Sequence, residues 1–229
     1  MLPEAKAVGN VSSEQMAQGL RLVKDFLSAA NLDREVLRGG KPDKALALLD
    51  PLQKSVLSDL RGALKRPSFE QDPTVMFSRF APDEVELVGS TVKVRGRMAV
   101  KPGSEGEALV HADYNFVYPV AKVRRGGGGR DEVTRTVIRR ELEVVIANPA
   151  RARVTPGKLW ITSWDADIAN SACDRYDGYL HPEFDSDLED EPMPSGPTSD
   201  PYDRSKTLDE RLKERERYGT DSCGAVTRI

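Results

Sequence analysis

Apolar residues near the start of the chain recur at helical spacing. Intervals of four, three and four positions place four of them on one stripe, namely Met16, Leu20, Val23 and Leu27. Ser12 precedes this stripe and Gln15 follows Ser12 by three positions, which is the capping-box pattern of a helix start. We therefore expect one long amphipathic helix with a single buried face.

Shorter helices are expected to follow. Two are predicted over 32–37 and 43–49, where glycine and proline residues mark the ends. Asp50 and Pro51 then supply a cap and a first-turn proline for a further helix, which Pro67 ends. The inner face of this helix carries Leu52, Val56, Leu57, Leu60 and Leu64.

From Val85 onward the apolar period changes to two, which is typical of half-buried strands. Strands are expected over 85–87, 91–100, 109–120, 133–146 and 159–163. One face of the third strand carries Val110, Ala112, Tyr114, Phe116 and Tyr118. The opposite face carries His111, Asp113 and Asn115. Glycine-containing turns over 101–106 and 126–129 predict hairpins, so the fold class is α+β: N-terminal helices packed on a curved antiparallel sheet of four or more strands.

The chain changes character after Cys173. Residues 174–191 contain eight acidic side chains and one arginine, and four prolines follow by position 201. Such a segment buries little apolar surface and orders poorly by itself. The chain is therefore expected to form a single domain over 1–170 and an irregular acidic, proline-rich tail over 171–229, with a short charged helix over 207–218.

Composition narrows the class of partner. The 229 residues are 38% hydrophobic and 31% charged, with a net charge of −3. This charge gives no overall attraction to nucleic acid, and none is expected as a partner. The sequence has no run of 18 apolar residues and no signal-peptide pattern, so membrane contact is expected only through an anchor that this sequence does not contain.

Two cysteines provide the evidence on compartment. Cys173 and Cys223 bracket the acidic, proline-rich segment. A disulfide between them would close a loop of about 50 residues and stabilise the folded state by roughly 4 kcal/mol on the chain-entropy estimate. We expect this disulfide and with it an extracytoplasmic or secreted protein. The alternative is a cytoplasmic protein with two unrelated thiols.

The polar row of His111, Asp113 and Asn115 is the best candidate for chemistry. Alternate strand residues project from one face about 6.6–7 Å apart, and a histidine near a carboxylate can transfer protons. The alternative is a polar surface whose members pair across strands with Lys93, Arg95, Arg97, Glu141 and Glu143. No catalytic residue is expected on balance; if the protein is an enzyme, Asp113 and His111 carry the reaction.

Other chemical motifs are missing. His111 and His181 have no second histidine or cysteine at ligand spacing, and the acidic run near Asp185 lacks the EF-hand pattern. The glycines at 126–129 precede a strand where a phosphate loop would precede a helix. No metal and no cofactor are therefore expected.

Aromatic residues suggest a possible ligand pocket. Trp160 and Trp164 lie four positions apart, so a regular strand would place them on one face. Together with Tyr114 and Phe116 they could line a pocket. The alternative is that these rings fill the core between the sheet and the helices.

Helices followed by long alternating strands, over Ser12 to Ile168, resemble the nuclear transport factor 2-like, cone-shaped α+β folds. The arginine-, alanine- and glycine-rich texture and the paired cysteines also resemble uncharacterised exported or membrane-anchored proteins of high-GC actinobacteria. The first resemblance implies a cone whose interior can hold a ligand; enzymes of that group use an aspartate or histidine inside it. Only His111 and Asp113 could match, and they lie opposite the aromatic face.

These observations favour a non-catalytic extracytoplasmic interaction or scaffold module. Its partner is expected to be a protein, and a homodimer formed through the sheet is possible. The alternative is a small-molecule-binding or isomerase-like protein that uses a cone-shaped pocket.

Overall fold

The computed structural model describes residues 2–123, 132–188, 196–216 and 224–226. Four helices come first: α1 (Ser13–Asn31), α2 (Arg34–Leu37), α3 (Asp43–Leu48) and α4 (Lys54–Lys65), followed by the short 3-10 helix η1 (Pro73–Val75). The predicted capping box is present at α1, where the Ser12 hydroxyl accepts from the Gln15 N–H and the Gln15 side chain accepts from the Ser12 N–H.

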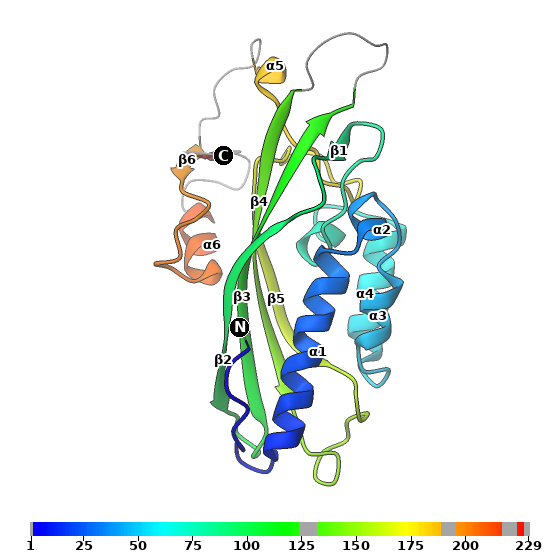
Figure 1. Ribbon diagram of the computed structural model, residues 1–229, viewed down its shortest axis with the longest axis vertical. Coiled ribbons are helices and arrows are strands. Elements are labelled where there is room, and N and C mark those ends of the chain that lie inside the picture. The colour runs from blue at the N-terminus through cyan, green and yellow to red at the C-terminus, as the bar shows by residue number, and fades with distance from the viewer. Residues whose placement is uncertain (1, 124–131, 189–195, 217–223, 227–229) are drawn as a thin grey trace.

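The expected α+β architecture is confirmed by a five-stranded antiparallel sheet. Its strands are β1 (Val85–Leu87), β2 (Lys93–Pro102), β3 (Ala108–Lys122), β4 (Val133–Ile146) and β5 (Trp160–Ala169). The long strand β3 pairs along one side with β2 and then β1, and β4 lies between β3 and β5. The helical layer covers one face of this strongly twisted sheet (Figure 1).

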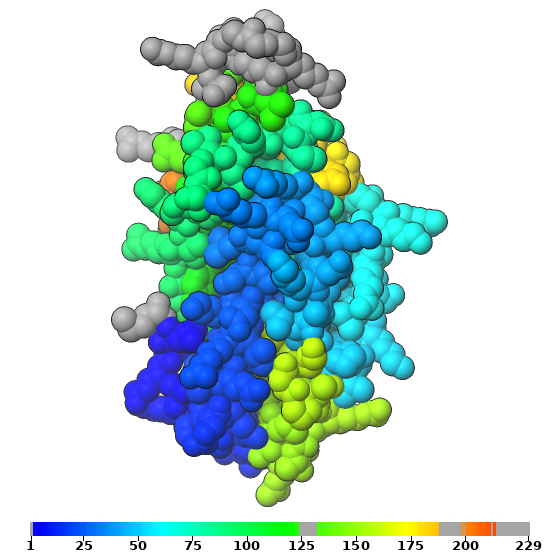
Figure 2. Space-filling model, turned by 45° about the vertical axis from the view of Figure 1, so that its right-hand side comes forward, coloured from blue at the N-terminus to red at the C-terminus, as the bar shows by residue number. Residues whose placement is uncertain are grey.

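Side chains fill the space between the helices and the sheet. α1 contributes Leu20, Val23 and Phe26, and the facing strands contribute Phe116 and Ile138, all nearly inaccessible to solvent. Gly19 lets α1 approach β4 closely, because a Cβ atom there would lie 2.2 Å from Cδ1 of Ile146. Figure 2 shows α1 in blue with α3 and α4 in cyan beside it, and the green edge of the sheet uncovered by these helices.

The start of α4 differs from the sequence prediction. Asp50 does not cap α4, which begins at Lys54 with Gln53 at the cap position. The buried Asp50 carboxylate instead accepts from the backbone N–H and the hydroxyl of Thr155, at 2.6 and 2.7 Å. Asp50 therefore ties the helical layer to the loop before β5, a contact that the local sequence does not show.

Residues 180–184 and 200–211 of the C-terminal region lie against the body of the protein. Leu180 and Phe184 are buried in the main core, and Leu180 bridges to Phe80. Three short elements follow, α5 (Asp185–Leu188), β6 (Gly196–Ser199) and α6 (Leu208–Glu216), and β6 pairs with β7 (Gly224–Val226). Figure 1 places α6 on the side of the sheet away from α1.

Two expectations fall outside the described residues. The glycine-rich connection over 126–129 is one, and the Cys223 end of the expected disulfide is the other. Within the described residues, no helix combines the length and apolar character needed to cross a membrane.

Candidate functional site

The predicted polar row lies on the face of the sheet opposite the helices, which we call the outer face. His111 stands opposite Glu143 on β4, and Asp113 stands opposite Glu141. On the other side, β2 places Arg97 opposite Asp113. The row therefore has the cross-strand charged neighbours that the sequence suggested.

Asp113 is enclosed by cations. Its carboxylate receives hydrogen bonds from Nε and Nη2 of Arg139 at 3.0 and 3.1 Å, and Nη2 of Arg204 lies 2.6 Å from Oδ2. Asp113 and Arg139 are only 7% and 3% exposed. Burial alone would raise the pKa of Asp113, but the hydrogen bonds and charges of Arg139 and Arg204 outweigh it and lower that pKa. The Asp113 carboxylate is thus ionised, and both of its oxygens are bound by arginines. A general base needs an oxygen that faces a substrate.

Residues 200–211, here called the C-terminal strap, cover this part of the outer face. The Arg139 guanidinium donates to the carbonyl oxygen of Lys206 at 2.7 Å, and the Asn115 side chain donates to that of Pro201 at 3.0 Å. Leu208 is buried, and its N–H donates to Glu141 at 3.2 Å.

Arg211 fixes the end of the strap. Its guanidinium lies 3.0 Å from the Asp167 carboxylate on β5 and also bonds the Asp203 backbone. The strap therefore contributes two guanidinium groups to a sheet surface that carries Asp113, Glu141 and Asp167. Arg139, Arg204 and Arg211 were not predicted as site residues, because the contact between strand and strap is visible only in three dimensions.

A second buried arginine lies on the inner face. Arg140 donates to the carbonyl oxygens of Val75 and Thr74 and to the Ser78 hydroxyl, the last at 3.1 Å. Desolvation lowers the pKa of Arg140 to about 10. The Tyr118 hydroxyl lies 2.8 Å from the same Ser78 oxygen, and burial raises the pKa of Tyr118. These hydrogen bonds join η1 and Ser78 to strands β3 and β4 of the sheet.

The four aromatic candidates do not share one pocket. Tyr114 and Phe116 line an apolar groove of about 290 Å³ between β2, β3 and α1. Trp160 stands opposite Val145, and Trp164 stands opposite Leu142, so the two rings are on opposite faces. The cause is a register shift between Glu143 and Val144, which adds one residue to β5 and reverses the side-chain alternation.

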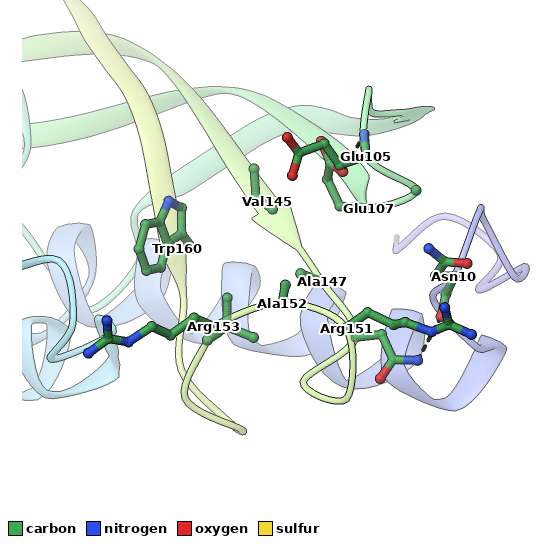
Figure 3. Close-up of a pocket in the computed structure, with 12 residues that line it drawn as sticks. Asn10, Glu105, Glu107, Val145, Ala147, Arg151, Ala152, Arg153 and Trp160 are labelled. Carbon is green, nitrogen blue, oxygen red and sulfur yellow. Dashed lines mark hydrogen bonds between the residues drawn. The ribbon is translucent and has the colours of Figure 1, made fainter.

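Trp160 lines a mixed polar pocket of about 260 Å³ at one end of the sheet (Figure 3). Carboxylates of Glu105 and Glu107 come from the β2–β3 hairpin, and Arg151 comes from the loop before β5. The Asn148 side chain donates to the Asn10 carbonyl oxygen at 2.9 Å and joins the N-terminal turn to that loop. The pocket offers exposed charges of both signs beside one aromatic ring.

His181 forms a further charged cluster near β1. Its Nδ1 lies 2.7 Å from Oε2 of Glu84, and its Nε2 lies 2.8 Å from Oδ1 of Asp177. Arg175 also bonds Glu84, at 2.8 Å. Burial alone would raise the pKa of Glu84, but the hydrogen bonds from Arg175 and His181 outweigh this effect and lower it.

His181 holds two segments of the chain together through its ring nitrogens. The ring is 3% exposed and both nitrogens are already occupied, so it joins the segment after β5 to the residue before β1. The described residues contain no group of three histidine, cysteine or acidic side chains arranged to hold a metal ion.

Comparison of the chain with protein-family models, with curated proteins and with solved structures found no match. The residues themselves therefore carry the functional argument.

Proposed function

We propose that the protein is a non-catalytic extracytoplasmic interaction or scaffold module. The observation that carries this proposal is the state of Asp113, which is bound by two arginines and covered by the C-terminal strap. Activation of this carboxylate for proton transfer would require release of Arg204 and of the strap. The polar row is therefore better suited to holding the chain together than to turning over a substrate.

The inner face supports the same proposal. A small-molecule-binding or isomerase-like protein, the competing function, needs space between the helices and the sheet. Here Leu20, Phe26 and Leu57 fill the middle of that space together with Phe116 and Ile138, and the opening that remains is the groove of about 290 Å³ at the β2 edge. Binding through an outer surface needs no such space.

The extracytoplasmic location rests on the two cysteines. Cys173 lies directly after β5, and the strap lies between Cys173 and Cys223 along the chain. A disulfide would limit how far the strap can move from the sheet in an oxidising compartment. Alkylation of unreduced protein from its native host, followed by mass spectrometry, should find neither thiol modified. Two alkylated thiols would contradict this location.

Photocrosslinking in the native host tests the interaction role. A photoreactive amino acid placed in turn at three exposed positions, Ala99, Arg61 and Arg153, samples β2, α4 and the sheet-end pocket. We expect a covalent adduct with one protein from one of these surfaces and none from the others. A tightly retained small molecule in native mass spectra, with no protein adduct from any position, would favour the competing function.

A further inference from the structure

Strand β2 forms an open edge of the sheet. Among the described residues it pairs with β3 alone. The Gly103 N–H donates to the Glu107 carbonyl oxygen, which places the odd-numbered residues of β2 in hydrogen-bonded pairs with β3. The backbone N–H and C=O groups of Val94, Gly96 and Met98 therefore point to the open side. A bare edge of this kind can accept another strand.

The outer side of this edge is basic. Lys93, Arg95 and Arg97 are exposed and alternate along β2, about 7 Å apart. None of the three forms an ion pair with another residue in the described ranges. The outer side of the edge thus presents three cations in a row to solvent.

The inner side of the same edge borders an apolar groove, which Leu2 of the N-terminal segment also lines. Val94 is 43% exposed and borders the groove of about 290 Å³, with Leu27 of α1 on the opposite wall. The Tyr114 ring lies close against Gly96, where a Cβ would be 2.3 Å from Cδ1 of Tyr114. Lys24 lies at the rim. The helical layer leaves this edge of the sheet uncovered (Figure 2).

We propose that β2 binds an extended segment of a protein partner in which apolar side chains alternate with acidic ones. Residues directly opposite each other in a paired sheet point to the same face. Every second side chain of the added strand would therefore enter the groove beside Val94, and the intervening side chains would face Lys93, Arg95 and Arg97. This inference rests on the proposed interaction function and specifies its partner.

Other occupants fit these features less well. A second copy of β2 would bring two basic rows side by side, which is unfavourable. In some proteins the charges on an edge strand have no partner and simply prevent aggregation. That role does not require an apolar groove beside the charges. An anionic lipid would use the cations and the groove and leave the regularly spaced backbone groups unused.

Peptide binding to the full chain tests the proposal. The probe is a fluorescent seven-residue peptide of alternating glutamate and valine, and binding is followed by fluorescence anisotropy at low salt. We expect saturable binding that weakens at least tenfold when lysine replaces each glutamate, because the attraction to the basic row becomes repulsion.

Backbone methylation distinguishes strand pairing from charge attraction. The added strand is placed antiparallel to β2, so each valine that faces the groove stands opposite Val94, Gly96 or Met98, and its N–H group bonds β2. Methylation of the valine nitrogens should weaken binding at least tenfold, since several hydrogen bonds are lost. Methylation of the glutamate nitrogens should change binding less than about threefold, because those N–H groups point away from β2. Equal effects of the two modifications would overturn the proposal.

Matched variants locate the site. Arg95→Glu combined with Arg97→Glu should weaken binding at least tenfold, whereas Arg61→Glu on exposed α4 should not. Val94→Asn should weaken binding severalfold, whereas Val88→Asn, at a valine that is 40% exposed, should not. Thermal melting of each variant establishes that it is folded.

The remaining outcomes separate the two proposals. Absence of peptide binding would overturn the strand inference, while a protein adduct from Arg61 or Arg153 would leave the interaction function standing. Binding to phosphatidylglycerol vesicles that Arg95→Glu abolishes, without peptide binding, would identify a lipid surface and overturn the strand inference.

Discussion

Two consecutive arginines on β4 are buried on opposite faces of the sheet, and the two faces supply different partners for the charge. Arg139 points outward, where Asp113 and Glu141 supply carboxylates and the strap supplies a cover. Arg140 points inward, where its described hydrogen bonds end on two carbonyl oxygens and one hydroxyl. The inner face is completed by helices that follow one another early in the chain. The outer face is completed by a segment that begins only at Asp200.

The difference shows that burial alone does not define a reactive site. Both guanidinium groups are almost inaccessible, yet each is surrounded by groups that use most of its donors. Nε of Arg140 is the exception, since it is buried without a partner among the described residues. Arg139 joins the sheet to the strap, and Arg140 joins the sheet to η1. Substitution of each residue should show how much its contacts contribute to stability.

The largest effect is expected from the inner arginine. Arg140→Met keeps an apolar stem and leaves the carbonyl oxygens of Thr74 and Val75 buried without this donor. We expect the free energy of unfolding to fall by about 3 kcal/mol or more, measured by urea denaturation. Arg140→Lys should recover part of this loss, because it keeps the charge but cannot reach all three acceptors. Unchanged stability in Arg140→Met would contradict the role described.

The two tryptophans provide the next test. Trp164 packs against the main core, whereas Trp160 lies on the outer face at the pocket. Trp164→Ala should therefore lower the free energy of unfolding by about 2 kcal/mol, and Trp160→Ala by less than about 1 kcal/mol. Denaturant titration of both variants makes the comparison. Equal losses would mean that the register shift does not separate the rings.

Acid should weaken the contacts of Asp113 on the outer face. The pKa of Asp113 is lowered, so its stabilising contribution is present above the unfolded value, near pH 4, and is lost as pH falls through the lower folded value. Burial raises the pKa of Glu141, so Glu141 takes up its proton at higher pH and partly offsets the loss. We expect the Arg139 Nε–H signal in NMR spectra to shift toward that of a free guanidinium only below about pH 4, as pH falls through the lowered pKa of Asp113.

Asp113→Asn is the control for this titration. The variant lacks the carboxylate, so the strap contact should be weak throughout and the Arg139 signal should show no comparable acid step. An Arg139 Nε–H signal that is the same near neutral pH in Asp113→Asn and in the unmodified protein would show that Asp113 is not its principal acceptor.

The smallest effect is expected at the end of the strap. Arg211→Ala removes the contact to Asp167 but leaves Arg204 in place. Because Arg211 is partly exposed, the loss should be about 1 kcal/mol and mostly local. Limited proteolysis should cut the strap faster while the melting temperature changes little. Lys213→Ala, which removes an exposed ion pair to Asp209, is the matched control.

Elements with strong local patterns could be predicted from the sequence. The capping residues Ser12 and Gln15 and the stripe that includes Leu20 predicted α1, and alternation predicted the bounds of β4. The start of α4 was wrong because Asp50 bonds Thr155, more than 100 positions away. The faces of the tryptophans were wrong because one extra residue in β5 leaves no local signature.

The candidate site was harder to predict than the fold. Asp113 could be assigned to the polar face from alternation alone, but its partner Arg204 is 91 positions further along the chain. Nδ1 of His181 meets Glu84 only after the segment behind β5 folds back, whereas Nε2 meets Asp177 within the same segment. The edge character of β2 likewise depends on which strands pair, and periodicity does not specify strand order.

The position of the strap in the sequence also determines when the outer face can be covered during synthesis. A growing chain can pack its helices against the sheet once β5 has emerged, but Arg139 and Asp113 stay exposed until residues 200–211 follow. A chain that ended at Ser199 would keep its apolar core and present a charged, uncovered surface. The strap is thus made after the sheet that it covers, and it completes the outer face.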